Sequence, residues 1–223
     1  MNGYPPACIL FDLDGTLVDS LPGIEFSVRE AFRSCRLPLA KESLREMVGP
    51  PIRTILSQAG NVKEESSLDT LERAFRASYD GEGWRKTVCF PAASQVLRTM
   101  HEWGHRLFVV SNKPRDISLQ ILKRERLLEY FEVIVTRDSR SPDYRGKGEM
   151  IGALLAERVI TVEKCVMVGD TTEDAKAAAS AGINFIWMTH GYGTAVQMSS
   201  VPVAHTLGSL SQLLPLMLKE PFL

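Results

Sequence analysis

The sequence has no excess of either charge and no long apolar run. Its 26 basic and 27 acidic residues leave a formal net charge of −1, so its electrostatics do not favour nucleic acid or a membrane surface. No apolar segment approaches the roughly 20 residues that cross a bilayer as a helix. The N-terminus, from Met1 to Pro6, lacks the basic and then apolar pattern of a signal peptide. We therefore expect a cytoplasmic protein with no nucleic-acid or membrane partner.

Cysteine is also scarce. The four cysteines are widely separated and form no Cys-x-x-Cys pair: Cys8, Cys35, Cys89 and Cys165. Two of them, Cys8 and Cys165, fall in apolar runs where a free cysteine behaves as a small hydrophobic side chain. Reduced, unlinked thiols are expected in a cytoplasmic chain with this spacing.

What the chain does contain is an alternation of strand and helix patterns. With 223 residues, 44% of them hydrophobic, it can bury the core of one domain plus an insertion. Short apolar runs predict strands at Cys8–Phe11, Leu107–Val110, Val133–Val135, Cys165–Val168 and Phe185–Met188, with a shorter one at Ala204–Thr206. Helical patterns lie between or after them at Ala93–Trp103, Asp116–Glu125, Glu149–Arg158, Glu173–Ala181 and Ser209–Leu218. Such alternation predicts a doubly wound parallel sheet.

One long stretch, from Ser20 to about Thr87, breaks this alternation. It has no convincing strand and four amphipathic helical patterns, at Gly23–Cys35, Lys41–Met47, Ile52–Ala59 and Ser67–Tyr79, separated by glycine and proline breakers. A connection of this length far exceeds what a crossover between parallel strands requires. We interpret residues 20–87 as an all-helical cap inserted into a core formed by residues 1–19 and 88–223.

Polar residues follow several of the predicted strands. Asp12 and Asp14 come directly after the first strand, and two carboxylates this close need a proton or a cation between them. Ser111 and Asn112 end the second strand, and Lys147 precedes a helix. Asp170 and Asp174 follow the fourth strand. In a doubly wound sheet these groups meet in one crevice at the carboxyl ends of the strands.

The combination of these groups indicates phosphoryl chemistry. Carboxylate oxygens suit a hard cation such as Mg²⁺, which also accepts phosphate oxygens. A lysine and a hydroxyl suit the remaining oxygens of a phosphoryl group, and an Asp carboxylate can attack phosphorus to form an aspartyl-phosphate.

Each of these residues also has a purely structural interpretation. An isolated Asp-x-Asp-Gly is a common surface turn, and Ser111-Asn112 could begin a helix. Lys147 could be a solvated loop residue, and Asp170 or Asp174 could cap the following helix. The functional interpretation depends on finding all of them in one chain.

The four segments resemble the four motifs of the haloacid dehalogenase-like hydrolase superfamily, in the family's order. They are Asp12 to Thr16, Ser111 to Lys113, Lys147, and Gly169 to Asp174. The opening segment, the Gly-Pro-Pro-Ile-Arg of residues 49–53 and the Gly-Tyr-Gly of residues 191–193 resemble the phosphoglycolate phosphatase-like subgroup, whose cap lies between the first two motifs. Gly148 stands where the family usually has proline after the third-motif lysine.

The resemblance implies a role for each matching residue. Asp12 would be the nucleophile and a Mg²⁺ ligand, and Asp14 the general acid and base, touching the metal through its backbone carbonyl. Ser111, Asn112 and Lys147 would hold or shape the phosphoryl site. Asp170 would ligate the metal, and Asp174 would ligate it or orient Lys147.

Three further residues receive expectations. A threonine at position 16 resembles the phosphatases of the family more than its sugar phosphomutases. We assign Thr16 to substrate binding. Arg53, in the cap, is a candidate for a substrate carboxylate or second anion, with a solvated helix arginine as its alternative. Lys113 is expected to point elsewhere.

The expected fold is α/β, a Rossmann-like parallel sheet core with an inserted all-helical cap. The expected function is a Mg²⁺-dependent phosphatase for a small phosphorylated metabolite, with phosphoglycolate, nucleoside monophosphates and sugar phosphates all open, in a monomer or homodimer. A β-phosphoglucomutase-like phosphomutase and a non-enzymatic, Asp-phosphorylated signalling domain remain alternatives.

Overall fold

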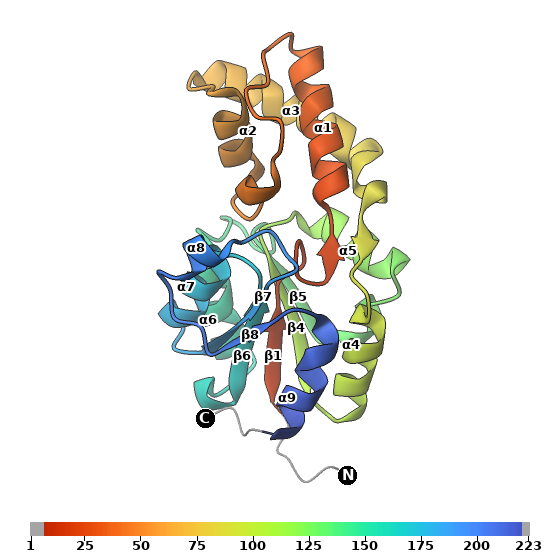
Figure 1. The fold of residues 1–223 in the computed structure, drawn as a ribbon, viewed down its shortest axis with the longest axis vertical. Helices are drawn as coiled ribbons and strands as arrows, with labels where there is room; N and C mark the ends of the chain where they lie inside the picture. The colour runs from red at the N-terminus through yellow and green to blue at the C-terminus, as the bar shows by residue number, and fades with distance from the viewer. Residues whose placement is uncertain (1–6, 220–223) are drawn as a thin grey trace.

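The computed structural model describes residues 7–219 as a parallel sheet between helices, with a helical unit beyond the carboxyl ends of the strands (Figure 1). The sheet has six parallel strands in the order β5-β4-β1-β6-β7-β8. They are β1 (Cys8–Phe11), β4 (Arg106–Ser111), β5 (Val133–Thr136), β6 (Cys165–Gly169), β7 (Asn184–Met188) and β8 (His205–Leu207). The predicted α/β fold class is confirmed.

The central position of β1 follows from its composition. All four of its residues are buried, which suits a strand covered on both faces. Its side chains alternate between two hydrophobic clusters: Ile9 and Phe11 contact one, and Cys8 and Leu10 the other. The backbone pairs with β4 on one side and with β6 on the other.

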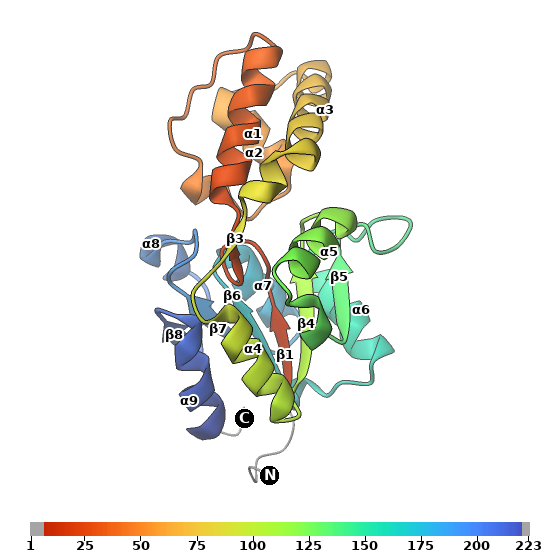
Figure 2. The same cartoon turned by 90° about the vertical axis from the view of Figure 1, so that its right-hand side faces the viewer.

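Helices cover both faces of the sheet (Figures 1 and 2). The first cluster contains side chains of α4 (Ala93–Glu102), α5 (Arg115–Arg124) and α9 (Leu213–Lys219). The second contains those of α6 (Lys147–Glu157), α7 (Thr172–Ser180) and the short α8 (Ala195–Met198). Single 3-10 turns lie at η3 (Leu128–Tyr130), η4 (Val162–Lys164) and η5 (Leu210–Gln212). This two-sided covering is the doubly wound arrangement.

The helical unit, residues 21–86, is called the helical insertion below. It consists of α1 (Leu21–Ser34), η1 (Arg45–Met47), α2 (Ile52–Gly60), α3 (Glu65–Gly81) and η2 (Gly83–Lys86). Buried Val28, Phe32, Leu56, Leu71 and Phe75 hold its helices together. Two short antiparallel strands, β2 (Val18–Asp19) and β3 (Val88–Cys89), join it to the sheet part, as Figure 2 shows. The division into domains at residues 19/20 and 87/88 stays a prediction.

The structure differs from the predicted elements at Lys41–Met47, β2, β3 and α8. The helix expected at Lys41–Met47 is wrong: only Arg45–Met47 form a 3-10 turn, because Pro38 and the Gly-Pro-Pro of residues 49–51 leave too little room for stable helical turns. The two-residue strands β2 and β3 and the four-residue α8 were missed because they are too short to show a periodic pattern.

No helix within residues 7–219 has the length and apolarity needed to cross a membrane.

Candidate active site

The site lies where the carboxyl ends of β1, β4 and β6 meet, at the edge of the sheet facing the helical insertion (Figure 1). The chain proceeds from β1 to β4 on one side and later returns to β6 on the other, which makes this edge a topological switch point. Asp12 follows β1, and its backbone N–H donates to the carbonyl of Val168 at 2.9 Å. Ser111 ends β4, and Asp170 follows β6.

Lys147, the first residue of α6, lies between two buried carboxylates. Its Nζ is 2.8 Å from Oδ1 of Asp12 and 2.6 Å from Oδ1 of Asp174. Burial alone lowers the pKa of Lys147, but the charges of Asp12 and Asp174 outweigh it and raise that pKa above its ordinary value. Lys147 therefore stays charged. Lys147 and Asp12 lie side by side, and their roles in one active site stay predictions.

Asp12 is a carboxyl group whose negative charge is poorly solvated. It is 3% exposed, and burial raises its pKa well above the ordinary value, with the charges of Asp174 and Asp170 adding to the effect and Lys147 opposing it. Burial likewise raises the pKa of Asp170 to about 7, and the charge of Asp174 adds to that shift. A single lysine thus does not balance three carboxylates, and further positive charge would lower the pKa values of Asp12 and Asp170.

The three carboxylates have the arrangement of a metal site. Asp12, Asp170 and Asp174 each offer an oxygen, and these oxygens all lie within 4.8 Å of one another. Hard oxygen donors with excess negative charge suit a divalent cation such as Mg²⁺, so the donor set fits such an ion.

Within that cluster, Asp174 is already engaged. Its Oδ1 accepts from Lys147, and its Oδ2 accepts from the hydroxyl of Thr171 at 2.7 Å and the Thr171 N–H at 2.9 Å. These bonds fix the start of α7 and orient Lys147. The geometry therefore favours the second of the two roles predicted for Asp174, and it leaves Asp12 and Asp170 as the candidates for metal ligands.

Asp170 is positioned by residues far from it in the chain. Its Oδ1 accepts from the hydroxyl of Thr16 at 3.0 Å, and its Oδ2 accepts from the backbone N–H of Tyr192 at 2.7 Å. Glycines allow this close approach: a Cβ at Gly15, where φ is +84°, or at Gly191 would come 2.2 Å from an atom of the Asp170 side chain. The sequence pattern around residues 191–193 pointed to the subgroup but not to this contact.

The placement of Thr16 corrects its predicted role. Thr16 is fully buried beneath Asp170 and does not line the cavity described below. It therefore orients a carboxylate and does not contact substrate in this arrangement.

Asp14 has a partner that the sequence analysis placed elsewhere. Nζ of Lys113 lies 3.0 and 2.9 Å from the two carboxylate oxygens of Asp14, and 4.8 Å from the ring centre of Tyr79 on α3. Lys113 is almost fully buried, and although burial lowers its pKa, the charge of Asp14 raises it above the ordinary value. The expectation that Lys113 points away from the site is wrong. No local pattern links two residues 99 positions apart.

Ser111 and Asn112 both lie at the site, with different neighbours. The hydroxyl oxygen of Ser111 accepts from the N–H of Lys113 at 3.2 Å and faces the cavity. The amide of Asn112 donates to the carbonyl of Gly49 at 3.1 Å and to Glu173 Oε1 at 2.7 Å. Asn112 therefore joins the edge of the sheet to the helical insertion. Glu173 is a member of this contact that the sequence analysis did not single out.

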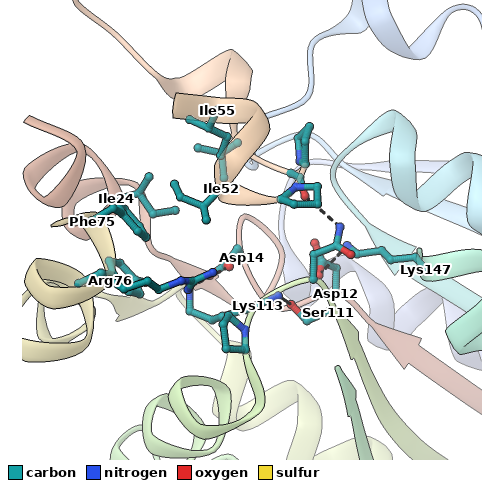
Figure 3. A pocket seen from close by; sticks show the side chains of 17 residues that line it. Asp12, Asp14, Ile24, Ile52, Ile55, Phe75, Arg76, Ser111, Lys113 and Lys147 are labelled. Carbon is teal, nitrogen blue, oxygen red and sulfur yellow. Dashed lines mark hydrogen bonds and ion pairs between the residues drawn. The ribbon is translucent and has the colours of Figure 1, made fainter. Parts of the chain in front are cut away.

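A cavity of about 70 Å³ separates the sheet edge from the helical insertion (Figure 3). The sheet part supplies its polar side, with Asp12, Asp14, Ser111, Asn112, Lys113 and Lys147. The insertion supplies the opposite wall. The catalytic and phosphoryl-binding residues predicted for the sheet core thus face one space, and their roles stay predictions.

Arg53 is not among the residues that line this cavity. Its guanidinium pairs with Glu65, with Asp69 at 2.7 Å and with Glu72 at 3.2 Å, all on α3. This placement contradicts the substrate contact predicted for Arg53, because three carboxylates of the insertion already occupy its donors. Arg76 lines the cavity instead, and the sequence analysis did not identify it.

Comparison with known proteins shows the family of this chain. The family model of haloacid dehalogenase-like hydrolases matches residues 9–188. The chain is 27% identical to the phosphoglycolate phosphatase of Nitrosococcus oceani over 214 residues, covering 93% of this chain and 95% of that protein. A crystal structure of a predicted phosphatase from Clostridium acetobutylicum superimposes with a TM-score of 0.86 at 26% identity, covering 97% of this chain and all of that one.

A mycobacterial protein also matches. The chain is 33% identical over 195 residues to the tyrosine-protein kinase PtkA of Mycobacterium tuberculosis, covering 86% of this chain but only 65% of that protein. The matched segment of 180 residues in the family model contains all four motifs, from Asp12 to Asp174. The chain therefore belongs to the haloacid dehalogenase-like hydrolase family.

Proposed function

We propose that this protein is a Mg²⁺-dependent phosphatase that hydrolyses a small phosphomonoester through a phosphorylated Asp12. The observation that carries the proposal is the meeting of Asp12, Lys147 and Asp170 at the carboxyl edge, with Asp14 facing the same cavity. Two relatives named phosphoglycolate phosphatase, matched over 95% and 80% of their own length, support the reaction class.

The chain's own residues would perform the two halves of the reaction. The carboxylate of Asp12 attacks phosphorus, while Lys147 and the hydroxyl of Ser111 hold the phosphoryl oxygens. Asp14 donates a proton to the leaving oxygen and later takes one from the water that hydrolyses the aspartyl-phosphate. Lys113, 2.9 Å from Asp14, stabilises the carboxylate left after the first proton transfer.

The metal would be held by Asp12 and Asp170 and, as the resemblance implies, by the backbone carbonyl of Asp14. Bound Mg²⁺ would supply positive charge that offsets the charges of the carboxylates and the phosphoryl group. Thr16 and the N–H of Tyr192 keep Asp170 directed toward this position.

The helical insertion would act as a cap that excludes water from the site. Three contacts support this role. Asn112 donates to the carbonyl of Gly49, and Arg45 donates to the carbonyls of His190 and Gly191. They connect the loop before α2 to the sheet part and leave the small cavity between the two.

Transfer to an acceptor other than water is the second candidate. The likeness to a protein named tyrosine-protein kinase favours it, and a phosphomutase would return the phosphoryl group to a sugar. A signalling domain would instead retain it. These alternatives differ from the phosphatase in the fate of the phosphoryl group on Asp12, which product analysis separates: free phosphate, an isomerised sugar phosphate, a phosphorylated acceptor or a long-lived aspartyl-phosphate.

The test is a panel of phosphomonoesters assayed for free phosphate with Mg²⁺ and with a chelator. The panel contains phosphoglycolate, nucleoside monophosphates and sugar phosphates. We expect Mg²⁺-dependent release from at least one of them, abolished in Asp12→Asn and retained in Asp116→Asn, which changes an exposed carboxylate on α5. Substantial release by Asp12→Asn, or release independent of divalent cations, would contradict the proposal.

A further inference from the structure

The wall that the helical insertion contributes to the cavity carries a single charged side chain. Ile24 of α1, Ile52 and Ile55 of α2 and Phe75 of α3 make this wall largely apolar, and Arg76 of α3 extends into the same space (Figure 3). A guanidinium beside apolar side chains loses part of its hydration, which strengthens its attraction for an anion.

Arg76 has no hydrogen-bond or ion-pair partner within residues 7–219. Its described contact is with the Phe75 ring, whose centre lies 5.8 Å from the guanidinium carbon. The carboxyl of Asp80 feels its charge but is beyond ion-pair distance. Arg53 provides the contrast, because three carboxylates of α3 surround it.

The other cations that line the cavity are already paired. Lys113 contacts Asp14, and Lys147 contacts Asp12 and Asp174. The charges of these two lysines are therefore directed at carboxylates of the sheet part. Arg76 therefore adds a positive charge on the opposite wall, where the organic part of a bound phosphomonoester would lie.

We propose that Arg76 forms a subsite for a second anionic group of the substrate and thereby selects small phosphomonoesters that carry a carboxylate over neutral ones. The planar fork of donors on a guanidinium matches the two oxygens of a carboxylate. The inference rests on the proposed phosphatase function.

The test compares matched substrates that differ by one charge. Phosphoglycolate and 3-phosphooxypropionate are each paired with the corresponding neutral amide, and kcat/KM is measured for all four. For the native protein we expect the acid to exceed its amide by about tenfold or more in at least one pair, as suits a hydrogen-bonded charge pair. Arg76→Met should reduce this ratio to about twofold or less, chiefly by lowering kcat/KM for the acid. Arg76→Lys should keep part of the preference.

Two control variants sharpen the comparison. Arg73→Met removes an exposed arginine one turn earlier on the same helix, and Arg53→Met removes the arginine that the sequence favoured. Both should keep the native acid-to-amide ratio. The subsite is refuted if the native protein hydrolyses acid and amide equally well, if Arg76→Met keeps the preference, or if it loses both substrates in proportion. If none of the four compounds releases phosphate while another phosphomonoester of the panel does, the subsite is refuted and the phosphatase function stands. If no phosphomonoester of the panel releases phosphate, the phosphatase function itself is contradicted.

Discussion

Nζ of Lys113 lies within 3.0 Å of both carboxylate oxygens of Asp14, although the two residues come from different strand ends. Lys113 also lies over the ring of Tyr79, which belongs to the helical insertion. The ion pair therefore connects the proposed general acid to the part of the protein that covers the site.

Replacing Lys113 by methionine should lower kcat by about 10- to 100-fold, with a smaller effect on KM. Asp14 would lose its nearest positive charge. The carboxylate that forms when Asp14 donates its proton would therefore be less stable. Steady-state kinetics on the best phosphomonoester measure the effect. Lys123→Met, at an exposed position of α5, is the control and should behave as the native protein does. An unchanged kcat in Lys113→Met would show that this ion pair does not assist the reaction.

Thr16→Val tests the corrected role of Thr16. Valine keeps the shape of threonine but cannot donate to Oδ1 of Asp170. Loss of such an orienting bond costs about 10- to 100-fold in metal affinity or activity, so the Mg²⁺ concentration for half-maximal activity should rise, while KM at saturating Mg²⁺ stays close to native. A rise in KM without a change in Mg²⁺ dependence would instead favour the substrate contact predicted from the sequence.

Gly191→Ala should damage the same carboxylate from the other side. The new Cβ would come 2.2 Å from the Asp170 Cβ, which forces the 191–193 loop away and removes the bond from the Tyr192 N–H. We expect a lower thermal midpoint of unfolding. We also expect the Mg²⁺ concentration for half-maximal activity to rise about tenfold. Gly152→Ala is the matched control because a Cβ there meets nothing within 4 Å, and it lies inside α6, where alanine is favoured. Native stability and Mg²⁺ dependence in Gly191→Ala would contradict the described geometry.

His105 should make folding stability depend on pH. It is buried, and its Nδ1 accepts the N–H of Ala7 at 3.1 Å; burial lowers its pKa below the ordinary 6.5. The unfolded chain thus binds the proton first, so this contribution to stability is present above about pH 6.5 and is lost as the pH falls toward the folded-state pKa.

Urea unfolding of the native protein and of His105→Asn, between about pH 8 and about pH 5.5, measures that contribution. Asparagine can accept the same N–H but does not titrate. The native protein should lose more stability than the variant over this interval. Equal losses would show that protonation of His105 does not matter to folding.

The sheet core could be predicted from the sequence because each strand is marked by a pattern of neighbouring residues. β1, β4 and β6 are continuous apolar runs, and the residues that end them carry the polar groups. Parallel pairing then requires those ends to meet at one edge. This is why Asp12, Ser111 and Asp170 could be assigned to one site without coordinates.

Contacts between segments that lie far apart in the sequence could not be predicted from such local patterns. Lys113 and Tyr192 act on carboxylates that belong to other strands, and no periodicity encodes such pairs. The sequence analysis chose Arg53, which follows the Gly-Pro-Pro of residues 49–51, and did not identify Arg76. Which one faces the cavity depends on how α2 and α3 lie against each other, and that packing left Arg53 among acids and Arg76 in the cavity.

The most direct test of the account is detection of a phosphoryl group on Asp12 during turnover. The native protein, mixed with its best substrate and Mg²⁺, is quenched in acid within one turnover, and the peptide containing residue 12 is analysed by mass spectrometry. We predict that this peptide gains one phosphoryl group on Asp12, that the label disappears when substrate is exhausted, and that Asp12→Asn shows none. Continuous release of phosphate with no label on Asp12 at any time would contradict the central claim.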